Sequence, residues 1–414
     1  MEKATIKQIL VEQLEIFEKP MKIVKRKFPN NILKNPKIVV ITGVRRSGKS
    51  TLLKEFSSYY KDYGYVNFED ERFLDFTYKD FNTLFESFLE INTNIKTFFF
   101  DEIQNISGWE KFVRRLFTDR FKIFVTGSNA NLLSSEIATS LTGRNLKIEL
   151  YPFSFEEYMS YVGFPLKNIY TTKERTQISN YLADYFKYGG FPEVVKTKNY
   201  EELTGIYQDI LIKDLLVRLK IRDSKDFREL ALYLLSNISK KISYNKIKNL
   251  FKFSNTSKVK NYVDFLAEAY MFFTVTKYAP SLKKQLVSNR KIYAIDMGII
   301  NAVAFQFSKN KGRLMENLVF LELKRRNKDI FYFEDKSECD FLIKEGMQII
   351  KAIQVTDNLS DLDTKKREIN GLLEAMDQFK LSEGLIITTD VEKELLIEKK
   401  KIKIVPLWKW LLNL

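Results

Sequence analysis

The 414-residue chain contains no histidine and a single cysteine. Without histidine it cannot form a Ser-His-Asp or Cys-His catalytic arrangement, and a structural zinc site would lack one of its two commonest ligands. The lone Cys339 excludes an internal disulfide and predicts a reducing, cytoplasmic location. Any catalysis must therefore come from carboxylates, lysine, arginine, hydroxyl groups and a hard cation such as Mg²⁺.

Long apolar runs are also missing. No apolar segment approaches the about 20 residues that a membrane-spanning helix needs, and residues 1–20 lack the apolar core of a signal peptide. Hydrophobic residues make up 45% of the chain and charged residues 29%, a balance typical of a globular protein. We therefore expect no membrane partner, and the length predicts two or three domains.

Acidic charge is in deficit, because 68 Lys and Arg stand against 53 Asp and Glu and leave a net charge of +15. A basic protein favours polyanionic partners, of which duplex DNA is one. A lysine-rich composition can equally reflect genome bias or a hot habitat, so the charge alone leaves both interpretations open.

A phosphate-binding motif, Gly-x-x-x-x-Gly-Lys-Ser, runs from Gly43 to Ser50. A β-branched strand pattern at 37–42 precedes it and a helical pattern at 51–56 follows it, which is the context this motif requires. Backbone N–H groups at a helix N-terminus would face the phosphates, Lys49 would reach the β- and γ-phosphates, and Ser50 would bind Mg²⁺. The residues predicted to hold the nucleotide are Gly43, Arg45, Arg46, Ser47, Gly48, Lys49, Ser50 and Thr51.

Two carboxylates follow a second apolar strand pattern at 97–100. Asp101, at the end of that strand, would hold Mg²⁺ through water, and Glu102 would polarise the attacking water. An acidic loop after a core strand is the simpler alternative, but its pairing with the phosphate motif favours the catalytic interpretation.

A third strand pattern at 123–125 leads into Thr126-Gly-Ser-Asn129. A polar side chain here would lie between the two motifs and orient water near the γ-phosphate, with Asn129 or Ser128 as candidates and Thr126 as a third. Farther on, Arg144 could offset phosphoryl charge in its own chain or from a neighbouring subunit. The alternative is a solvated arginine at a turn.

The order of patterns predicts an α/β protein that begins with a mainly parallel P-loop NTPase sheet. Three helical patterns and a hairpin then suggest a winged helix, in which residues 255–260 suit DNA contact; a module that only packs between domains is the alternative. The predicted segments are an N-terminal helical segment at 1–35, the ATPase domain at 36–160, a helical lid or linker at 161–222, the winged-helix-like module at 223–300 and a small α/β module at 312–414.

The last module resembles the core of PD-(D/E)XK nucleases. Glu316 falls on a helix pattern, Asp340 on a strand and Gln354 on the next strand. In such nucleases two acidic residues at the strand positions and the helix glutamate bind Mg²⁺, and a lysine activates water. Here Gln354 replaces the second acid and Thr356 replaces the lysine.

No nearby lysine restores that arrangement, because Lys344 and Lys351 lack the spacing. We therefore predict a degenerate nuclease site without cleavage activity.

Taken in order, the motifs of the whole chain resemble a bacterial and archaeal family of AAA+-like P-loop ATPases, related to STAND-type NTPases, with a winged helix and a C-terminal nuclease-like domain. The segments that carry the resemblance are GVRRSGKSTLL, NFED, FFFDEIQNISGW, VTGSNANLLSSEIATSLTGR, LYPFSFEEY, YGGFPEVV, LVSNRKIYAIDMGI and ECDFLI with IQV. The resemblance implies phosphate and Mg²⁺ roles for Lys49 and Ser50, an Mg²⁺- and water-activating pair at Asp101 and Glu102, a sensor at Ser128 or Asn129, and a finger at Arg144.

These patterns predict an Mg²⁺-dependent ATPase whose nucleotide state repositions the C-terminal modules. ATP is expected as the cofactor because no guanine-reading Asn-Lys-x-Asp segment is present. The alternatives are an ATP-switched DNA-binding protein, a weak nuclease that uses Asp340, and an ATPase whose partner is a protein or another copy of itself.

Overall fold

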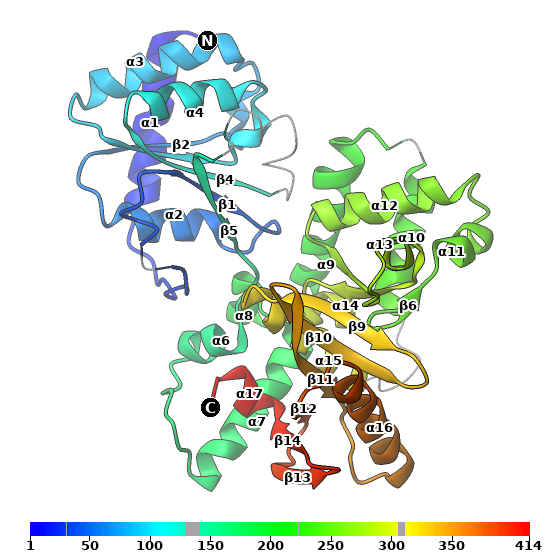
Figure 1. Cartoon of the computed structure of the whole chain (residues 1–414). Coiled ribbons are helices and arrows are strands. Elements are labelled where there is room, and N and C mark those ends of the chain that lie inside the picture. The colour runs from blue at the N-terminus through cyan, green and yellow to red at the C-terminus, as the bar shows by residue number, and fades with distance from the viewer. Residues whose placement is uncertain (30, 129–140, 142, 222, 305–310) are drawn as a thin grey trace. The chain divides into compact units, whose positions relative to one another are not determined.

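The computed structural model describes residues 1–29, 31–128, 141, 143–221, 223–304 and 311–414 (Figure 1). The chain divides into two compact units, Met1–Tyr151 and Pro152–Leu414. Within the described residues, no helix is both long enough and apolar enough to cross a membrane.

A parallel sheet forms the centre of the first unit. Its five strands, counted over the described residues, lie in the order β2-β3-β4-β1-β5, and every neighbouring pair is parallel. The predicted parallel α/β sheet is thus confirmed, and the carboxyl ends of all the strands meet at one edge. The strands are β1 (Ile38–Thr42), β2 (Tyr63–Asn67), β3 (Thr97–Asp101), β4 (Lys122–Gly127) and β5 (Asn145–Glu149).

Helices cover both faces of this sheet because successive strand residues point to opposite faces. Phe98 and Phe100 pack in a core with α1, α3 and α4, whereas Phe99 packs in a second core with α2 (Figure 1). The helices are α1 (Lys3–Glu18), α2 (Lys49–Ser57), α3 (Phe81–Ile91) and α4 (Trp109–Thr118), with short 3-10 turns η1 (Glu71–Phe73), η2 (Tyr78–Asp80) and η3 (Ile103–Asn105).

The second unit opens with helices and continues into a small sheet. The role of residues 161–222 as a lid or linker stays a prediction. In the described part of the chain this sheet has the order β6-β8-β7, and both of its pairings are antiparallel. The β7–β8 pairing confirms the predicted hairpin, with α13 in its connection. The elements are α6 (Phe155–Tyr161), α7 (Thr172–Tyr188), α8 (Pro192–Thr197), α9 (Tyr200–Asp209), the π-helical η5 (Ile210–Val217), α10 (Ser224–Ser236), β6 (Lys241–Ile242), α11 (Tyr244–Leu250), α12 (Thr256–Glu268), β7 (Phe272–Thr276), α13 (Leu282–Val287), β8 (Arg290–Ala294) and α14 (Met297–Val303).

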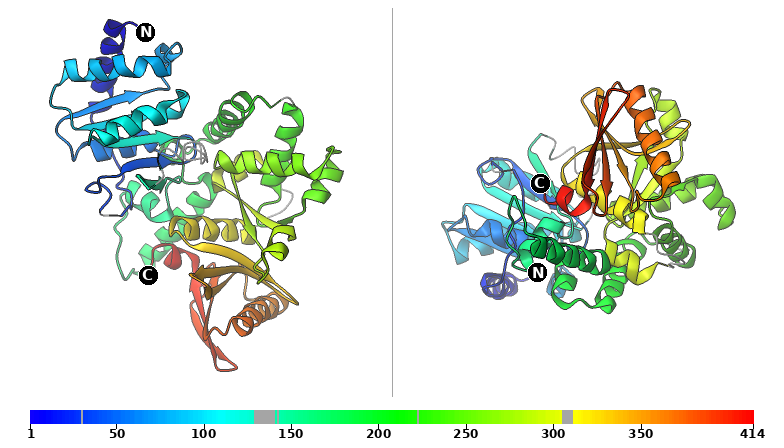
Figure 2. Two further views of the ribbon diagram at one scale, coloured as in Figure 1. Left: turned by 45° about the horizontal axis from the view of Figure 1, so that its top comes forward. Right: turned by 90° about the horizontal axis from the view of Figure 1, so that it is seen from below.

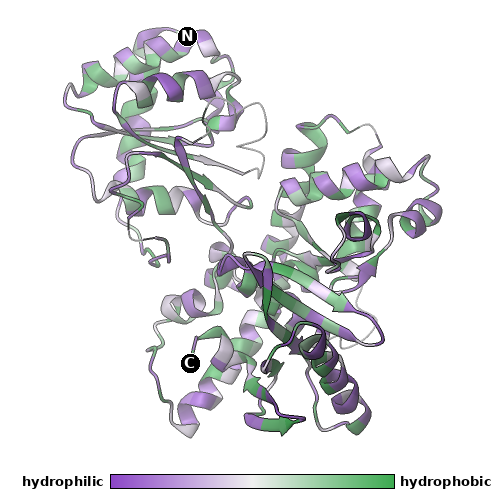
Figure 3. Ribbon diagram, in the orientation of Figure 1, coloured by the Kyte–Doolittle hydropathy of each residue, from purple (hydrophilic) through white to green (hydrophobic). Residues whose placement is uncertain are grey.

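A mixed sheet closes the second unit, with its six described strands in the order β13-β14-β12-β11-β10-β9. Helix α16 is amphipathic, and its apolar residues Leu372, Ala375 and Met376 pack on the sheet (Figures 2 and 3). The elements are α15 (Lys311–Arg325), β9 (Asp329–Glu334), β10 (Glu338–Glu345), β11 (Gln348–Val355), α16 (Leu362–Gln378), β12 (Glu383–Thr388), β13 (Lys393–Ile397), β14 (Lys400–Pro406) and α17 (Leu407–Leu411).

Three segments far apart in sequence meet at the buried carboxylate of Asp296. This carboxylate caps α14 by accepting the N–H groups of Gly298 (2.8 Å) and Ile299 (3.2 Å), and it also accepts the N–H of Gly190 (2.7 Å). The carbonyl oxygen of Gly190 in turn accepts the N–H of Phe153 at 2.7 Å. Burial raises the pKa of Asp296 to about 6, against the lowering effect of these hydrogen bonds.

Close packing at this junction accounts for part of the sequence of three segments that carry the family resemblance, and it requires no catalytic role for them. A Cβ at Gly190 would lie 2.3 Å from the carbonyl oxygen of Phe153, and one at Gly298 would lie 2.3 Å from that of Tyr188. Backbone segments approach too closely here for any side chain. The segments LYPFSFEEY, YGGFPEVV and IYAIDMGI therefore owe part of their sequence to packing.

We expect Gly190→Ala to destabilise the protein by about 1–3 kcal/mol, because the Phe153 backbone would have to move. Gly205→Ala is the matched control: Gly205 lies in α9 with no atom within 4 Å of the added Cβ. That change should stabilise by about 0.5–1 kcal/mol through helix propensity. Thermal unfolding of both variants measures the difference, and equal shifts would contradict the close-packed junction.

Candidate nucleotide-binding site

The loop between β1 and α2 is shaped by its glycines. A Cβ at Gly43 would lie 2.1 Å from the carbonyl oxygen of Leu150, so only glycine fits. Gly48 has φ +97°, a conformation that L side chains rarely adopt, and α2 begins directly after it at Lys49. The loop therefore ends with N–H groups at a helix N-terminus, where anions bind.

The Lys49 ammonium is buried at the centre of this site, with 4% of the residue exposed. It donates to the Ser128 hydroxyl (2.7 Å) and to the carbonyl oxygens of Gly43 (3.3 Å) and Val44 (3.4 Å). Its Nζ also lies 3.2 Å from Oε1 of Glu102. A buried charge needs such partners, and four different groups supply them here.

Asp101 is fully buried at the end of β3. Its carboxylate accepts hydrogen bonds from the hydroxyl groups of Ser50 and Thr126 and, at 3.4 Å, from that of Tyr65. Burial, with the neighbouring Glu102 charge, raises the pKa of Asp101 to about 6. Ser50 and Asp101 together present hydroxyl and carboxylate oxygens, the donor types that Mg²⁺ prefers.

Glu102 is held in an unusual backbone conformation. Its φ of 50° and ψ of 41° are left-handed, which costs a non-glycine residue about 1–3 kcal/mol. The Thr126 hydroxyl accepts the Glu102 N–H at 2.9 Å, while Gln104 (2.6 Å) and Ser128 (3.0 Å) donate to the side chain. Burial would raise the pKa of Glu102, but the Lys49 charge and the Gln104 hydrogen bond bring it below its usual value.

The third strand contributes through two hydroxyl groups. Ser128 contacts both Lys49 and Glu102, and Thr126 contacts both Asp101 and Glu102. The other sensor candidate, Asn129, lies outside the described residues. Tyr65 and Gln104 also belong to the site, and the sequence analysis did not single them out. Tyr65 lies outside the motifs, and Gln104 lies in the FFFDEIQNISGW segment but belongs to none of the residue types assigned a role there.

The remaining predicted nucleotide ligands line the loop. Arg45 pairs with Glu69 at 2.5 Å, Arg46 is exposed with a left-handed φ of 62°, and Ser47 is buried. A cavity of about 460 Å³ opens beside Ser50 and Thr51. The cavity places open space next to the predicted metal ligand.

Arg144 is not brought to this site within the first unit. It immediately precedes β5, and its carbonyl oxygen accepts the N–H of Ile38 at 2.9 Å. Because β5 runs parallel to β1 with Asn145 beside Ile38, Arg144 lies at the amino-terminal edge of the sheet, a strand length of roughly 16 Å from the loop. A role for Arg144 in its own chain is therefore unsupported, and a role from a neighbouring subunit stays a prediction.

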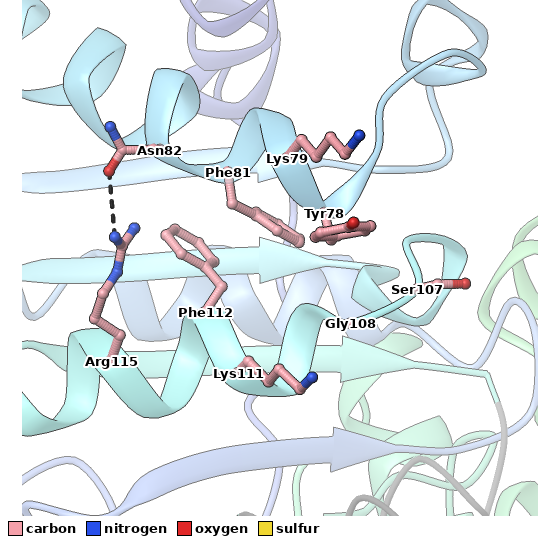
Figure 4. Close-up of a pocket in the computed structure, with 9 residues that line it drawn as sticks. All are labelled: Tyr78, Lys79, Phe81, Asn82, Ser107, Gly108, Lys111, Phe112 and Arg115. Carbon is pink, nitrogen blue, oxygen red and sulfur yellow. Dashed lines mark hydrogen bonds between the residues drawn. The ribbon is translucent and has the colours of Figure 1, made fainter.

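A second hollow, of about 410 Å³, lies between η2, α3 and α4 of the first unit (Figure 4). Figure 4 shows Tyr78 and Phe81 lying between the side chains of Lys79 and Lys111. At the other end Arg115 donates to the Asn82 side chain at 3.2 Å. The described lining residues include three cations and no carboxylate, so the hollow is basic and partly aromatic.

Two of the residues proposed for DNA contact, Asn255 and Lys258, have partners of their own. Asn255 caps the helix by accepting the Lys258 N–H at 2.8 Å, and the Lys258 ammonium lies 2.6 Å from Asp223. Both side chains therefore already have structural roles.

The three nuclease-like residues lie together in the second unit. Glu316 and Asp340 both accept from the Lys291 ammonium at 2.9 Å, and Gln354 accepts the Asp340 N–H at 3.0 Å. Sequence reasoning missed Lys291, which comes from β8, because nothing in a strand pattern marks a buried lysine.

Comparison with known proteins defines the class. Residues 35–159 match a family model described as an AAA domain, and residues 154–310 match a domain of unknown function (DUF8612). The first unit is thus an AAA-type P-loop domain, which confirms that part of the predicted resemblance. The winged-helix and nuclease-like parts stay predictions.

Two relatives match along most of their length. "Uncharacterized protein MJ1544" of Methanocaldococcus jannaschii is 39% identical over 433 residues, covering 99% of this chain and 96% of its own. An uncharacterised protein of Haemophilus influenzae is 31% identical over 365 residues, covering 83% and 87%. The chain belongs to the archaeal and bacterial family that these two proteins represent. Among solved structures, a Cdc6p of Pyrobaculum aerophilum is 13% identical, covers 70% of this chain and 96% of its own, and has a TM-score of 0.28.

Proposed function

We propose that the protein binds ATP with Mg²⁺ and hydrolyses it. The observation that carries the proposal is the direct contact between the Lys49 ammonium, the Glu102 carboxylate and the Ser128 hydroxyl, beside Asp101 and Ser50. Phosphoryl transfer needs positioned charges more than covalent chemistry, and these residue types provide them.

The residues divide the work by chemistry. Lys49 would offset charge on the β- and γ-phosphates, and Ser50 with Asp101 would hold Mg²⁺, which neutralises phosphate charge when bound. If a triphosphate forms an ion pair with the Lys49 ammonium, the Glu102 carboxylate loses its ion pair with Lys49. Glu102, still oriented by Gln104 and Thr126, can then accept a proton from water.

The proposal extends to movement of the second unit. Arg26 donates to the carbonyl oxygen of Ser47 in the loop (2.8 Å) and to that of Tyr151 (3.3 Å), the last residue of the first unit. The adjacent Leu150 has its carbonyl oxygen against Gly43. These contacts support a link from the nucleotide loop to the chain segment that leads into Pro152–Leu414.

A second candidate function is ATP-switched nucleic-acid binding. The net charge of +15 and the basic, aromatic hollow around Lys79, Lys111 and Tyr78 favour it. Cations bind backbone phosphates, and aromatic rings offer stacking surfaces. Action on a protein partner or on a second copy stays a prediction.

We expect Lys49→Ala to weaken ATP binding about 10- to 100-fold, because charge-assisted hydrogen bonds to phosphate are lost. Glu102→Gln should retain binding but lower turnover about 100-fold or more. Binding is measured with a fluorescent ATP analogue, with GTP as competitor, and turnover by phosphate release. The exposed Lys61→Ala and Glu15→Gln are matched controls. Full turnover in both site variants would refute the site assignment.

We expect ATP to change the distance between dyes at Lys61→Cys and Lys399→Cys, both exposed, in the full chain. The native Cys339 is buried and should not label. Arg26→Gln should retain ATP binding but reduce the change in energy transfer, because the bridge between the loop and Tyr151 is lost. An unchanged response in Arg26→Gln would exclude this coupling route.

For the second candidate, Lys79→Glu with Lys111→Glu should lower affinity for a fluorescent duplex oligonucleotide about 10-fold at low salt and reduce the salt slope by about 2. Lys61→Glu with Lys96→Glu makes the same charge change at exposed positions elsewhere on the first unit. Fluorescence anisotropy measures both pairs. Equal loss in the two pairs would mean that only net charge matters, and no binding by the parent chain would dismiss the candidate.

A further inference from the structure

A buried cluster of charges lies where β8, α15 and β10 meet. The Lys291 ammonium is 2.9 Å from a carboxylate oxygen of Glu316, 2.9 Å from one of Asp340 and 2.6 Å from one of Glu338. Its side chain is 2% exposed. Two of the three carboxylates, Glu316 and Asp340, are the positions where a PD-(D/E)XK site would hold its metal.

The ammonium has three N–H groups, and three carboxylates lie within reach of it among the described residues. The oxygens stand 2.6–2.9 Å from Nζ, whereas oxygen ligands lie about 2.0–2.1 Å from Mg²⁺. The cluster therefore has the dimensions of an ammonium site, and a metal at the same point would have to displace the lysine.

The other potential ligands are also engaged. The second oxygen of Asp340 accepts the Val355 N–H at 3.0 Å. Gln354 accepts the Asp340 N–H through its oxygen and donates to Glu368 through its amide nitrogen. The Tyr293 hydroxyl donates to Glu316 at 2.7 Å. Because the oxygen of Gln354 is directed to a backbone N–H, it does not complete a metal site.

We infer that the Lys291 ammonium takes the place of a divalent cation in this module, so that the nuclease-like carboxylates are held together without metal. A divalent cation would add two charges beside a buried positive group, which opposes its binding. The module then serves as a metal-independent structural unit and does not cleave DNA by metal-activated water. Among the described residues, no group of three or more cysteine, aspartate or glutamate side chains is arranged to hold a metal ion.

A single substitution should convert the cluster into a metal site. Lys291→Met removes the ammonium at similar volume and leaves oxygen ligands that Mn²⁺ accepts. Mn²⁺ binding is measured by electron paramagnetic resonance on the full chain, in an Asp101→Asn background that removes the predicted metal ligand of the first unit. We expect no Mn²⁺ binding by the Asp101→Asn chain that retains Lys291. The Lys291→Met variant should gain one Mn²⁺ site, and adding Asp340→Asn should abolish it.

Two further variants distinguish loss of the ammonium from misfolding. Lys291→Arg keeps the positive charge and should bind no Mn²⁺. In the same Asp101→Asn background, Lys291→Met with Glu338→Gln removes one charge of each sign. Its melting temperature should rise with millimolar Mn²⁺, while that of the Asp101→Asn chain that keeps Lys291 and Glu338 should not. Mn²⁺ binding by the parent chain that Asp340→Asn abolishes would overturn the inference. So would a folded Lys291→Met chain that gains no site.

Discussion

The buried ion pair between Lys49 and Glu102 is the interaction on which the candidate nucleotide site depends. Burying either charge alone would be energetically costly. Each therefore requires the other, together with the Ser128 hydroxyl, which contacts both. The parallel sheet makes this pairing possible because β1, β3 and β4 all end at the same edge. The left-handed backbone of Glu102, anchored by Thr126, then aims the carboxylate at the lysine.

The protein holds a second buried ammonium, and its surroundings differ in a way that decides its role. Lys49 shares its N–H groups among one carboxylate, one hydroxyl and two backbone carbonyl oxygens, and a cavity opens beside the neighbouring Ser50. Phosphate oxygens can compete for such a donor. Lys291 is surrounded by the carboxylates of Glu316, Glu338 and Asp340, which are stronger partners. The partners of Lys49 thus suit the proposed exchange for phosphate, whereas those of Lys291 suit the structural role that we infer for it.

Motifs that look alike in a sequence serve different ends in this fold. One candidate site brings together the segments GVRRSGKS, FFFDE and VTGS, because their charged and hydroxyl side chains contact each other. LYPFSFEEY, YGGFPEVV and IYAIDMGI converge on Asp296, where the contacts are backbone hydrogen bonds and a close approach that only glycine allows. The candidate nucleotide site therefore lies in the first unit, whereas these three segments owe part of their sequence to packing.

The sequence by itself predicted the mainly parallel sheet of the first unit, and it marked Lys49, Ser50, Asp101 and Glu102 as candidate site residues, because both follow from local periodicity and motif spacing. The structure brings these four residues together. Tertiary structure alone decided which edge of the sheet each loop occupies, and so it separated Arg144 from the phosphate loop although both flank strands of the same sheet. It also brought Lys291 of β8 to Asp340 of β10, two residues 49 positions apart. Such contacts depend on how distant segments pack, and local sequence does not encode the packing of its partners.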